Sequence, residues 1–332
     1  LARAAVFDSP SEMLYGVRVS VQNGASAGKA YFLAGNVIDL NYSAVHWVED
    51  RLNSSVALLA TVAGLTISNP VDVNAVGGTG SSVLGAVSSV TTGGVNFTGA
   101  VTLQNQMTAT QELETLNLTS STSTGFGLVL GGVISEADGG IGATKDRLTL
   151  IKTGSGTATL TANNTFSGGI TINQGTLLVM NTPSVLTDSA TGSGPVTVLA
   201  GAVLGGIGHL NSAVTLAGAP GNSAVLRPGD PTTSASPVET LTINQPLTVS
   251  ANSVVEFTIG ATNFTKLAGT SIFLTTSSSR LLVQLESGYT PIIGAEFDLL
   301  DFTSLTIHGG ASNLLNLLLL PVTTVWDTST FM

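Results

Sequence analysis

The sequence predicts an all-β protein that coils as a β-solenoid, and two features of the chain carry this prediction. Short stretches that alternate apolar residues with threonine recur along the chain, and turns rich in glycine and asparagine separate them. Residues 148–179 show this arrangement most clearly. Alternation of this kind places the two sets of side chains on opposite faces of a strand. Short strands that recur at a nearly constant spacing are typical of a coil of stacked rungs.

The composition fits a β-rich chain with many turns. Of the 332 residues, 9% are charged, 5% are aromatic and 39 are glycine. The net charge of −10 argues against nucleic acid as a partner, because phosphate binding needs clustered lysine and arginine. The chain has no cysteine, which excludes disulfides and thiolate metal sites. No apolar run reaches the roughly 18 residues of a transmembrane helix, so no transmembrane segment is predicted.

The low charge also bears on association. Ordinary soluble domains have roughly 25% charged residues, far above the value for this chain. A monomer of this composition would expose mostly serine, threonine, asparagine and glycine, together with much valine and leucine. Large neutral surfaces are hydrated by hydroxyl groups or covered by partner chains. We therefore expect copies of the chain to assemble into a homopolymer.

A triplet of the form apolar-Thr-apolar marks successive coils. The triplets start at positions 148, 170, 196, 214 and 241, and are therefore 22, 26, 18 and 27 residues apart. Periods in this range indicate a solenoid whose rungs each hold two or three short strands. Secondary strands are expected between the triplets, at residues 158–160, 176–179, 202–204, 224–226 and 247–249. A β-sandwich also uses short alternating strands, but the ordered succession of a triplet and a glycine-containing phrase favours the solenoid.

The same residues resemble a known family. The run K-T-G-S-G-T-A-T-L-T-A-N-N-T-F-S-G-G-I-T-I-N-Q-G-T-L-L-V, which starts at Lys152, closely resembles the autotransporter-associated β-strand repeat of bacterial surface proteins. The glycine-rich residues 200–208, the Pro-Gly turn within 226–229, and residues 287–291 with 297–300 follow the order of that family. The resemblance covers about residues 148–302. It implies a right-handed parallel β-helix outside a bacterial cell.

Three parts of the chain are predicted. Residues 1–70 form an N-terminal cap or assembly segment, residues 71–302 form the β-solenoid rungs, and residues 303–332 form a C-terminal cap or contact segment. A cap is expected at each end because a terminal rung exposes its core and its unpaired backbone. Residues 43–52 are expected to form one short helix or a bent strand. Residues 314–320 are too apolar for a free surface and are expected to be buried under a cap or against a neighbouring subunit.

Aromatic and apolar side chains near the two ends are the candidate subunit contacts. They are Tyr15, Tyr31, His46, Trp47, Leu317, Leu318 and Trp326.

No catalytic, cofactor-binding or metal-ligating residue is predicted, and we expect the chain not to be an enzyme. Many β-helix proteins are polysaccharide lyases or hydrolases, which need clustered acids and bases. The acidic residues between 148 and 290 lie far apart in the sequence: Asp188, Asp230, Glu239, Glu256 and Glu286. Asp298 and Asp301 are three positions apart, on opposite faces if the segment is extended, and form no evident acid pair. The three histidines have no spacing typical of a metal site.

These observations predict an extracellular structural protein, a self-assembling subunit of a bacterial surface filament, sheath or layer. An adhesin-type autotransporter passenger, which binds a cell-surface glycan or protein, is the alternative. A polysaccharide lyase or hydrolase built on a β-helix is the second alternative.

Overall fold

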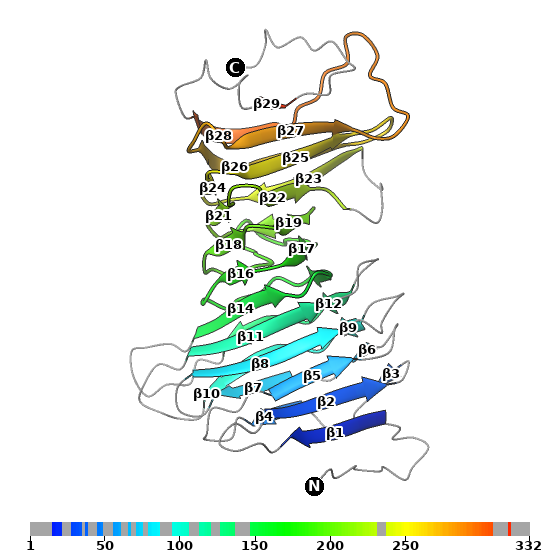
Figure 1. Cartoon of the computed structure of the whole chain (residues 1–332), viewed down its shortest axis with the longest axis vertical. Coiled ribbons are helices and arrows are strands. Elements are labelled where there is room, and N and C mark those ends of the chain that lie inside the picture. Colours follow the sequence, from blue (N-terminus) through cyan, green and yellow to red (C-terminus); the bar gives the residue numbers. More distant parts are fainter. Residues whose placement is uncertain are drawn as a thin grey trace.

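The structure is a computed structural model of the chain. It describes residues 15–21, 28–34, 37–38, 45–48, 56–60, 66–67, 71–75, 79–86, 95–105, 113–120, 127–136, 147–230, 237–307 and 318–319. All regular secondary structure in these ranges is β-strand, and nearly all strand pairs are parallel. The strands stack into one elongated coil, with β1 near one end and β29 near the other (Figure 1). The predicted all-β β-solenoid is confirmed, whereas its handedness and its capping segments stay predictions.

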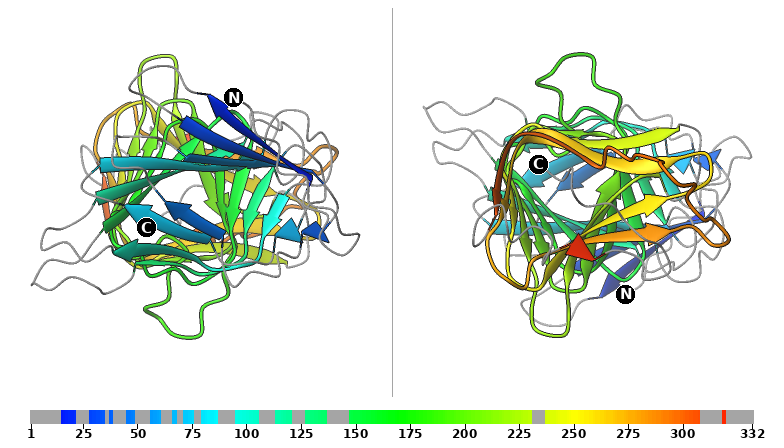
Figure 2. Two further views of the ribbon diagram at one scale, coloured as in Figure 1. Left: turned by 90° about the horizontal axis from the view of Figure 1, so that it is seen from below. Right: turned by 90° about the horizontal axis from the view of Figure 1, so that it is seen from above.

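The strands form three faces, and each face is a column of hydrogen-bonded neighbours. Viewed along the long axis, these columns surround a common interior (Figure 2). The first face contains β1 (Tyr15–Val21), β2 (Gly28–Ala34), β5 (Val56–Ala60), β8 (Thr79–Ala86), β11 (Leu113–Ser120), β14 (Arg147–Thr153), β16 (Ile170–Ile172), β18 (Val196–Leu199), β21 (Val214–Ala217) and β24 (Leu247–Val249).

The second face runs beside the first along the whole described coil. It contains β3 (Val37–Ile38), β6 (Thr66–Ile67), β9 (Val95–Phe97), β12 (Leu128–Leu130), β15 (Thr157–Leu160), β17 (Gly175–Val179), β19 (Ala202–Gly206), β22 (Ala224–Pro228), β25 (Ser253–Ile259), β27 (Arg280–Leu285) and β29 (Leu318–Leu319).

The third face is divided into two groups of strands. The first group is β4 (Val45–Val48), β7 (Val71–Ala75), β10 (Val101–Asn105) and β13 (Ile134–Glu136). The second group is β20 (His209–Leu210), β23 (Val238–Ile243), β26 (Phe264–Leu274) and β28 (Leu300–Ile307). The later residues of β26 also pair with β24, so this long strand turns the corner from the third face to the first.

The predicted triplets all lie in strands, but two details of their register differ from a simple repeat. On the first face Ile170 pairs with Leu150 and not with Leu148, so β16 is displaced by two residues. The fifth triplet lies in β23 on the third face, and the column of triplets continues instead through Leu247 of β24. A shift of two residues keeps every side chain on its face, so alternation alone could not distinguish these registers.

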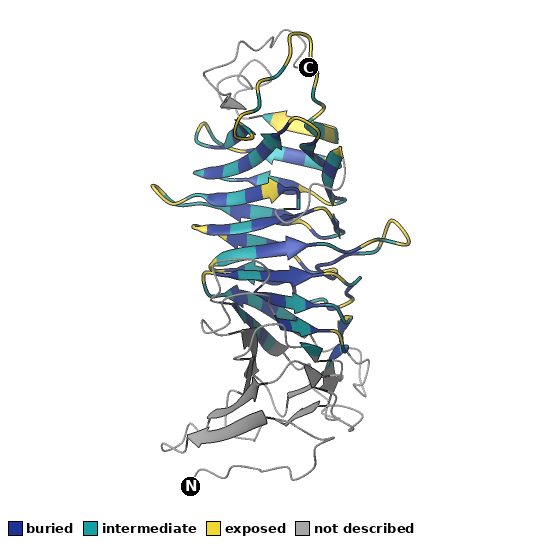
Figure 3. Cartoon of the chain, turned by 90° about the vertical axis from the view of Figure 1, so that its right-hand side faces the viewer, coloured by how far each residue is buried: buried dark blue, intermediate teal, exposed yellow. Residues whose placement is uncertain are grey.

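Alternating burial produces the core. Strand β25 alternates buried and half-buried residues along its whole length, and the inward residues of all three faces join one apolar cluster. Figure 3 shows this alternation as stripes along successive strands. Phe97, Phe166 and Phe257 are its largest apolar side chains with almost no exposed surface. Each such side chain contributes roughly 1.5–3 kcal/mol through burial, so the coil is stabilised along its axis and not at one centre.

A buried lysine forms hydrogen bonds with the backbone at one corner of the coil. Lys152 is fully buried at the end of β14. Its Nζ donates hydrogen bonds to the carbonyl oxygens of Thr153 at 2.8 Å, Gly154 at 2.8 Å and Gln174 at 3.1 Å. Burial lowers the pKa of Lys152 from 10.5 to about 8. This lysine of the family-like run therefore joins one coil to the next.

The ends of the described coil continue the same pairing. Residues 45–48 form strand β4, within the segment where a helix or a bent strand was expected. Parallel pairing crosses residue 70, as β5 pairs with β8 and β6 with β9, and β28 crosses residue 302. The division at residues 70 and 302 stays a prediction.

Candidate functional site

A groove lies at the corner where the second face meets the third, near β22, β25 and β27. Its volume is about 390 Å³, within the roughly 300–1,000 Å³ typical of ligand pockets. We call it the corner groove. Threonine hydroxyls and apolar side chains line one part of it, and Asp230, Glu239, Asn263 and Glu286 line another.

The coil brings these four residues together. Asp230 follows the end of β22, and Glu286 follows the end of β27. Both strands pair with β25 in parallel, so their carboxyl ends reach the same edge of the face. Glu239 is the second residue of β23, and Asn263 directly precedes β26, which pairs with β23. Acids that lie far apart in the sequence therefore converge at one corner.

Glu239 is the most unusual group in the corner groove. Its side chain is 95% buried, with a relative exposure of 5%. Oε2 accepts a hydrogen bond of 2.9 Å from the backbone N–H of Asp230, whereas Oε1 has no hydrogen-bond partner. Burial raises the pKa of Glu239, and the negative charges of Asp230 and Glu286 add to this effect. The Asp230 N–H and the Asn263 side chain act in the opposite direction without cancelling the rise in pKa.

Asn263 offers a second buried acceptor. Its relative exposure is 9%, and its Oδ1 has no hydrogen-bond partner. Its carbonyl oxygen accepts a 2.8 Å hydrogen bond from Gly260, which fixes the short connection between β25 and β26. A Cβ on Gly260 would lie 2.7 Å from Asn263 Oδ1 and would collide with Glu286 Oε2, so both oxygens border the same small space.

Gly229 forms another wall of the corner groove. Its φ of +112° lies in the left-handed region that disfavours residues with a side chain. A Cβ there would lie 2.7 Å from Thr265 Cγ2 and 3.0 Å from Glu239 Oε2. The Pro-Gly turn seen in the sequence therefore allows the backbone to pass directly beside Glu239.

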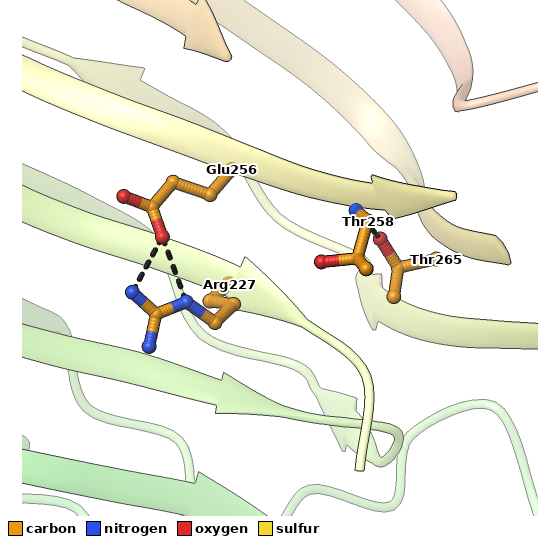
Figure 4. Close-up of polar contacts among 4 residues, drawn as sticks. All are labelled: Arg227, Glu256, Thr258 and Thr265. Carbon is orange, nitrogen blue, oxygen red and sulfur yellow. Dashed lines mark hydrogen bonds and ion pairs between the residues drawn. The ribbon is translucent and has the colours of Figure 1, made fainter. Parts of the chain in front are cut away.

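An ion pair lies on the second face, and its arginine also lines the corner groove. Arg227 Nε and Nη2 contact Glu256 Oε2 at 2.7 and 2.5 Å (Figure 4). Close by, the backbone N–H of Thr258 donates a 2.9 Å hydrogen bond to Thr265 Oγ1 and joins β25 to β26 (Figure 4). The charge of Arg227 is therefore matched by Glu256.

Asp298 and Asp301, which were not expected to form a pair, both form ion pairs with Lys266. Lys266 Nζ contacts Asp298 Oδ2 at 2.6 Å and Asp301 Oδ2 at 3.2 Å. Asp298 precedes the start of β28, so the alternation of an extended strand does not apply to it. The hydrogen bond to Asp298 is the largest of the effects that raise the pKa of Lys266. Both carboxylates are largely exposed, and such pairs contribute little to stability.

The predicted contact residues lie at opposite ends of the coil, as far as the structure describes them (Figure 1). Leu317 and Trp326 lie outside the described residues. The others belong to strands whose side chains are not described, so their role stays a prediction: Tyr15 in β1, Tyr31 in β2, His46 and Trp47 in β4, and Leu318 in β29.

Two further properties bear on function. The described part of the chain has no group of three or more histidine, aspartate or glutamate residues arranged to hold a metal ion. Within the same residues, no helix has the length and apolar character to span a bilayer.

Comparison with known proteins identifies the repeat. Residues 150–179 match the family model of the passenger-associated-transport-repeat. This match covers most of β14 and the whole of β15, β16 and β17. No curated protein matches the chain. The resemblance found in the sequence is thus confirmed for this segment.

Proposed function

We propose that this chain, which carries the repeat of autotransporter passenger-type surface proteins, is a structural subunit that packs side by side with copies of itself. Such packing would form a filament, a sheath or a layer outside the cell. The supporting observation is a neutral zone around the middle of the coil.

This zone, residues 148–226, has only two charged residues, Lys152 and Asp188. Lys152 is buried against three carbonyl oxygens. Asp188 Oδ2 accepts hydrogen bonds from the backbone N–H groups of Ser184 and Val185, at 2.6 and 3.1 Å, and from Asn163 Nδ2 at 3.0 Å. Because both charges are bonded within the chain, little electrostatic repulsion opposes the approach of a second copy.

An ordered loop in this zone presents apolar side chains to solvent. Val185 and Leu186 are 58% and 81% exposed. Asp188 fixes the start of the loop, and Asn244 Nδ2 donates a 3.1 Å hydrogen bond to the carbonyl oxygen of Leu186. The loop projects from the ring of strands and is green in Figure 2. A loop that is already ordered loses little conformational entropy on contact, which favours association.

Sedimentation velocity over a range of concentrations tests this proposal. We expect the wild type to form larger species as concentration rises, and Leu186→Lys to remain monomeric under the same conditions. Ile293→Lys is the matched control, because Ile293 is fully exposed but lies outside the neutral zone. A wild type that stays monomeric at every concentration, or equal association of both variants, would contradict the proposal.

The adhesin-type passenger remains a second candidate, and the corner groove is the observation that favours it. A rod of this kind would present the groove to a surface glycan or protein. Binding without any association between copies would support this candidate over the structural one.

We also propose that the chain is not an enzyme. A glycosidase places two carboxyl groups on the two sides of the scissile bond. Here the negative charges of Asp230 and Glu286 both act on Glu239 at one corner of the groove. A panel of polysaccharides incubated with wild type and Glu239→Gln is the test. Cleavage by the wild type that is lost in the variant would establish a hydrolase or lyase instead.

A further inference from the structure

We propose that the corner groove binds a protonated amino group carried on a polyhydroxylated ligand, such as an amino-sugar unit of a glycan. This inference goes beyond the structural role proposed above and does not depend on it.

The first argument is that two buried acceptors lack donors. Glu239 Oε1 and Asn263 Oδ1 are both without a hydrogen-bond partner, and both side chains are at least nine-tenths buried. Both residues line the corner groove. Buried polar groups are nearly always hydrogen-bonded, and an unpaired one costs free energy. A carboxylate oxygen and an amide oxygen only accept hydrogen bonds, so the ligand must bring donors.

The second argument is the charge of the site. Asp230, Glu239 and Glu286 all line the groove, and the pKa of Glu239 is raised by burial and further by the charges of the other two acids. Arg227 also lines the groove, but its guanidinium is paired with Glu256. The segment 231–236, which connects Asp230 to the strand of Glu239, has no ionisable residue in its sequence. A ligand with a positive charge therefore complements the groove.

The number of acceptors favours an ammonium group over a metal ion. Calcium takes six to eight oxygen ligands, whereas an ammonium group has three N–H donors. The described residues contain no cluster of acids and histidines arranged for a metal. Asn263 Oδ1 and Glu286 Oε2 border one space, and Glu239 Oε1 supplies a third acceptor. Charge-assisted hydrogen bonds to these three oxygens would satisfy an ammonium group.

The remainder of the groove suits a sugar ring. Thr157, Thr176 and Thr258 line it together with Leu178 and Val203. These residues provide hydroxyl groups beside apolar surface, and a sugar ring likewise combines hydroxyl groups with apolar C–H groups. The volume of about 390 Å³ is larger than an ammonium ion needs. The geometry therefore points to an amine that is part of a larger polyol.

Isothermal titration calorimetry of the full chain tests the inference with two probes. One probe is an oligosaccharide of glucosamine, and the other is the same oligosaccharide with every amine acetylated. We expect the glucosamine oligomer to bind at least about tenfold more tightly, because only its amines carry charge. Equal affinity for the two probes, or no binding of either, would overturn the inference.

Substitutions show whether the corner groove is the site. Glu239→Gln should weaken glucosamine binding by about tenfold or more, since it removes one charge-assisted hydrogen bond. Asp298→Asn makes the same change of charge outside the groove and should leave binding unchanged. Thermal unfolding checks that both variants are folded, and Glu286→Gln replaces Glu239→Gln if the latter does not fold. Equal weakening by Asp298→Asn would show that only overall charge matters.

The pH dependence gives a second readout. Among the described residues, Asp230, Glu286 and the amide of Asn263 act on the pKa of Glu239, and the one arginine that lines the groove, Arg227, is paired with Glu256. An ammonium group binds the ionised form of Glu239, so affinity should rise with pH as Glu239 loses its proton, within the acidic range in which the amines of the probe stay protonated. Glu239→Gln should abolish this rise. Calcium binding that Glu239→Gln abolishes, without glucosamine binding, would assign the site to a metal instead.

Sedimentation distinguishes this inference from the structural role. Glu239→Gln and wild type should associate equally, because the corner groove lies outside the exposed loop of the neutral zone. Loss of ligand binding together with normal association would leave the proposed structural function intact.

Discussion

Replacement of Lys152 by methionine tests how the coils are joined. Methionine has a similar length and fills the buried space, but it cannot donate to the carbonyl oxygens of Thr153, Gly154 and Gln174. Carbonyl groups left unpaired in the interior cost about 1–3 kcal/mol. Removal of the buried charge offsets part of the cost of the three unpaired carbonyl groups, and we expect Lys152→Met to reduce the free energy of unfolding by about 1–3 kcal/mol at pH 7.

The pH dependence of this loss is the sharper test. The pKa of Lys152 is about 8 in the folded protein and 10.5 when unperturbed. Between these values the unfolded chain binds more protons than the folded one, so stability rises with pH. Each pKa unit corresponds to about 1.4 kcal/mol, which gives an increase on the order of 3 kcal/mol for the wild type relative to Lys152→Met. The measurement is urea unfolding, monitored by circular dichroism, at several pH values between 8 and 10.5.

Lys266→Met provides the matched control, because the pKa of Lys266 is raised by Asp298 and Asp301 and not lowered. A raised pKa stabilises the folded state below the unfolded value, and this contribution disappears as pH rises through the folded pKa. The difference between wild type and Lys266→Met should therefore stay constant between pH 8 and 10.5 and shrink only above 10.5, whereas the difference for Lys152→Met grows across that range. A flat or shrinking difference for Lys152→Met would refute the reasoning, since the carbonyl oxygens would then offset the cost of burial.

Three further substitutions test other parts of the structure. Phe166→Ala removes a fully buried ring and should cost about 3–5 kcal/mol in urea unfolding, and a loss below 1 kcal/mol would contradict its place in the core. Gly229→Ala should lower the midpoint of thermal unfolding more than Gly221→Ala, because both glycines have positive φ but only the Cβ at 229 would meet neighbouring atoms; equal losses would contradict the crowding. Glu239→Gln should become more stable relative to wild type as pH rises above 4.5, since the raised pKa of Glu239 favours the folded state only while the group is protonated. A constant difference across acidic urea titrations would show that the pKa is not raised.

The repeating strands could be predicted because alternation and turn residues are local properties. Strand β16 coincides with the predicted triplet at 170–172, and its two isoleucines are buried while Thr171 is half-buried. The pairing of Ile170 with Leu150 could not be predicted in the same way. Alternation has a period of two, so shifts of two residues look identical in the sequence.

The corner groove was missed because its residues come from different coils. Glu239, Asn263 and Glu286 are 24 and 23 residues apart, close to the spacing of the triplets. Polar residues that recur at the period of the rungs are a signal for a shared corner, and this signal was present in the sequence. The burial and the unpaired oxygens of Glu239 and Asn263 depend on the packing of β23, β25 and β26, which the sequence alone does not describe.

The central claim is that the coil is a structural unit that packs side by side with copies of itself. Electron microscopy of the purified protein at increasing concentration tests it most directly. The account predicts ordered filaments or layers in which coils lie in lateral contact, with a rung spacing of about 4.8 Å. Monodisperse single particles at high concentration would contradict it.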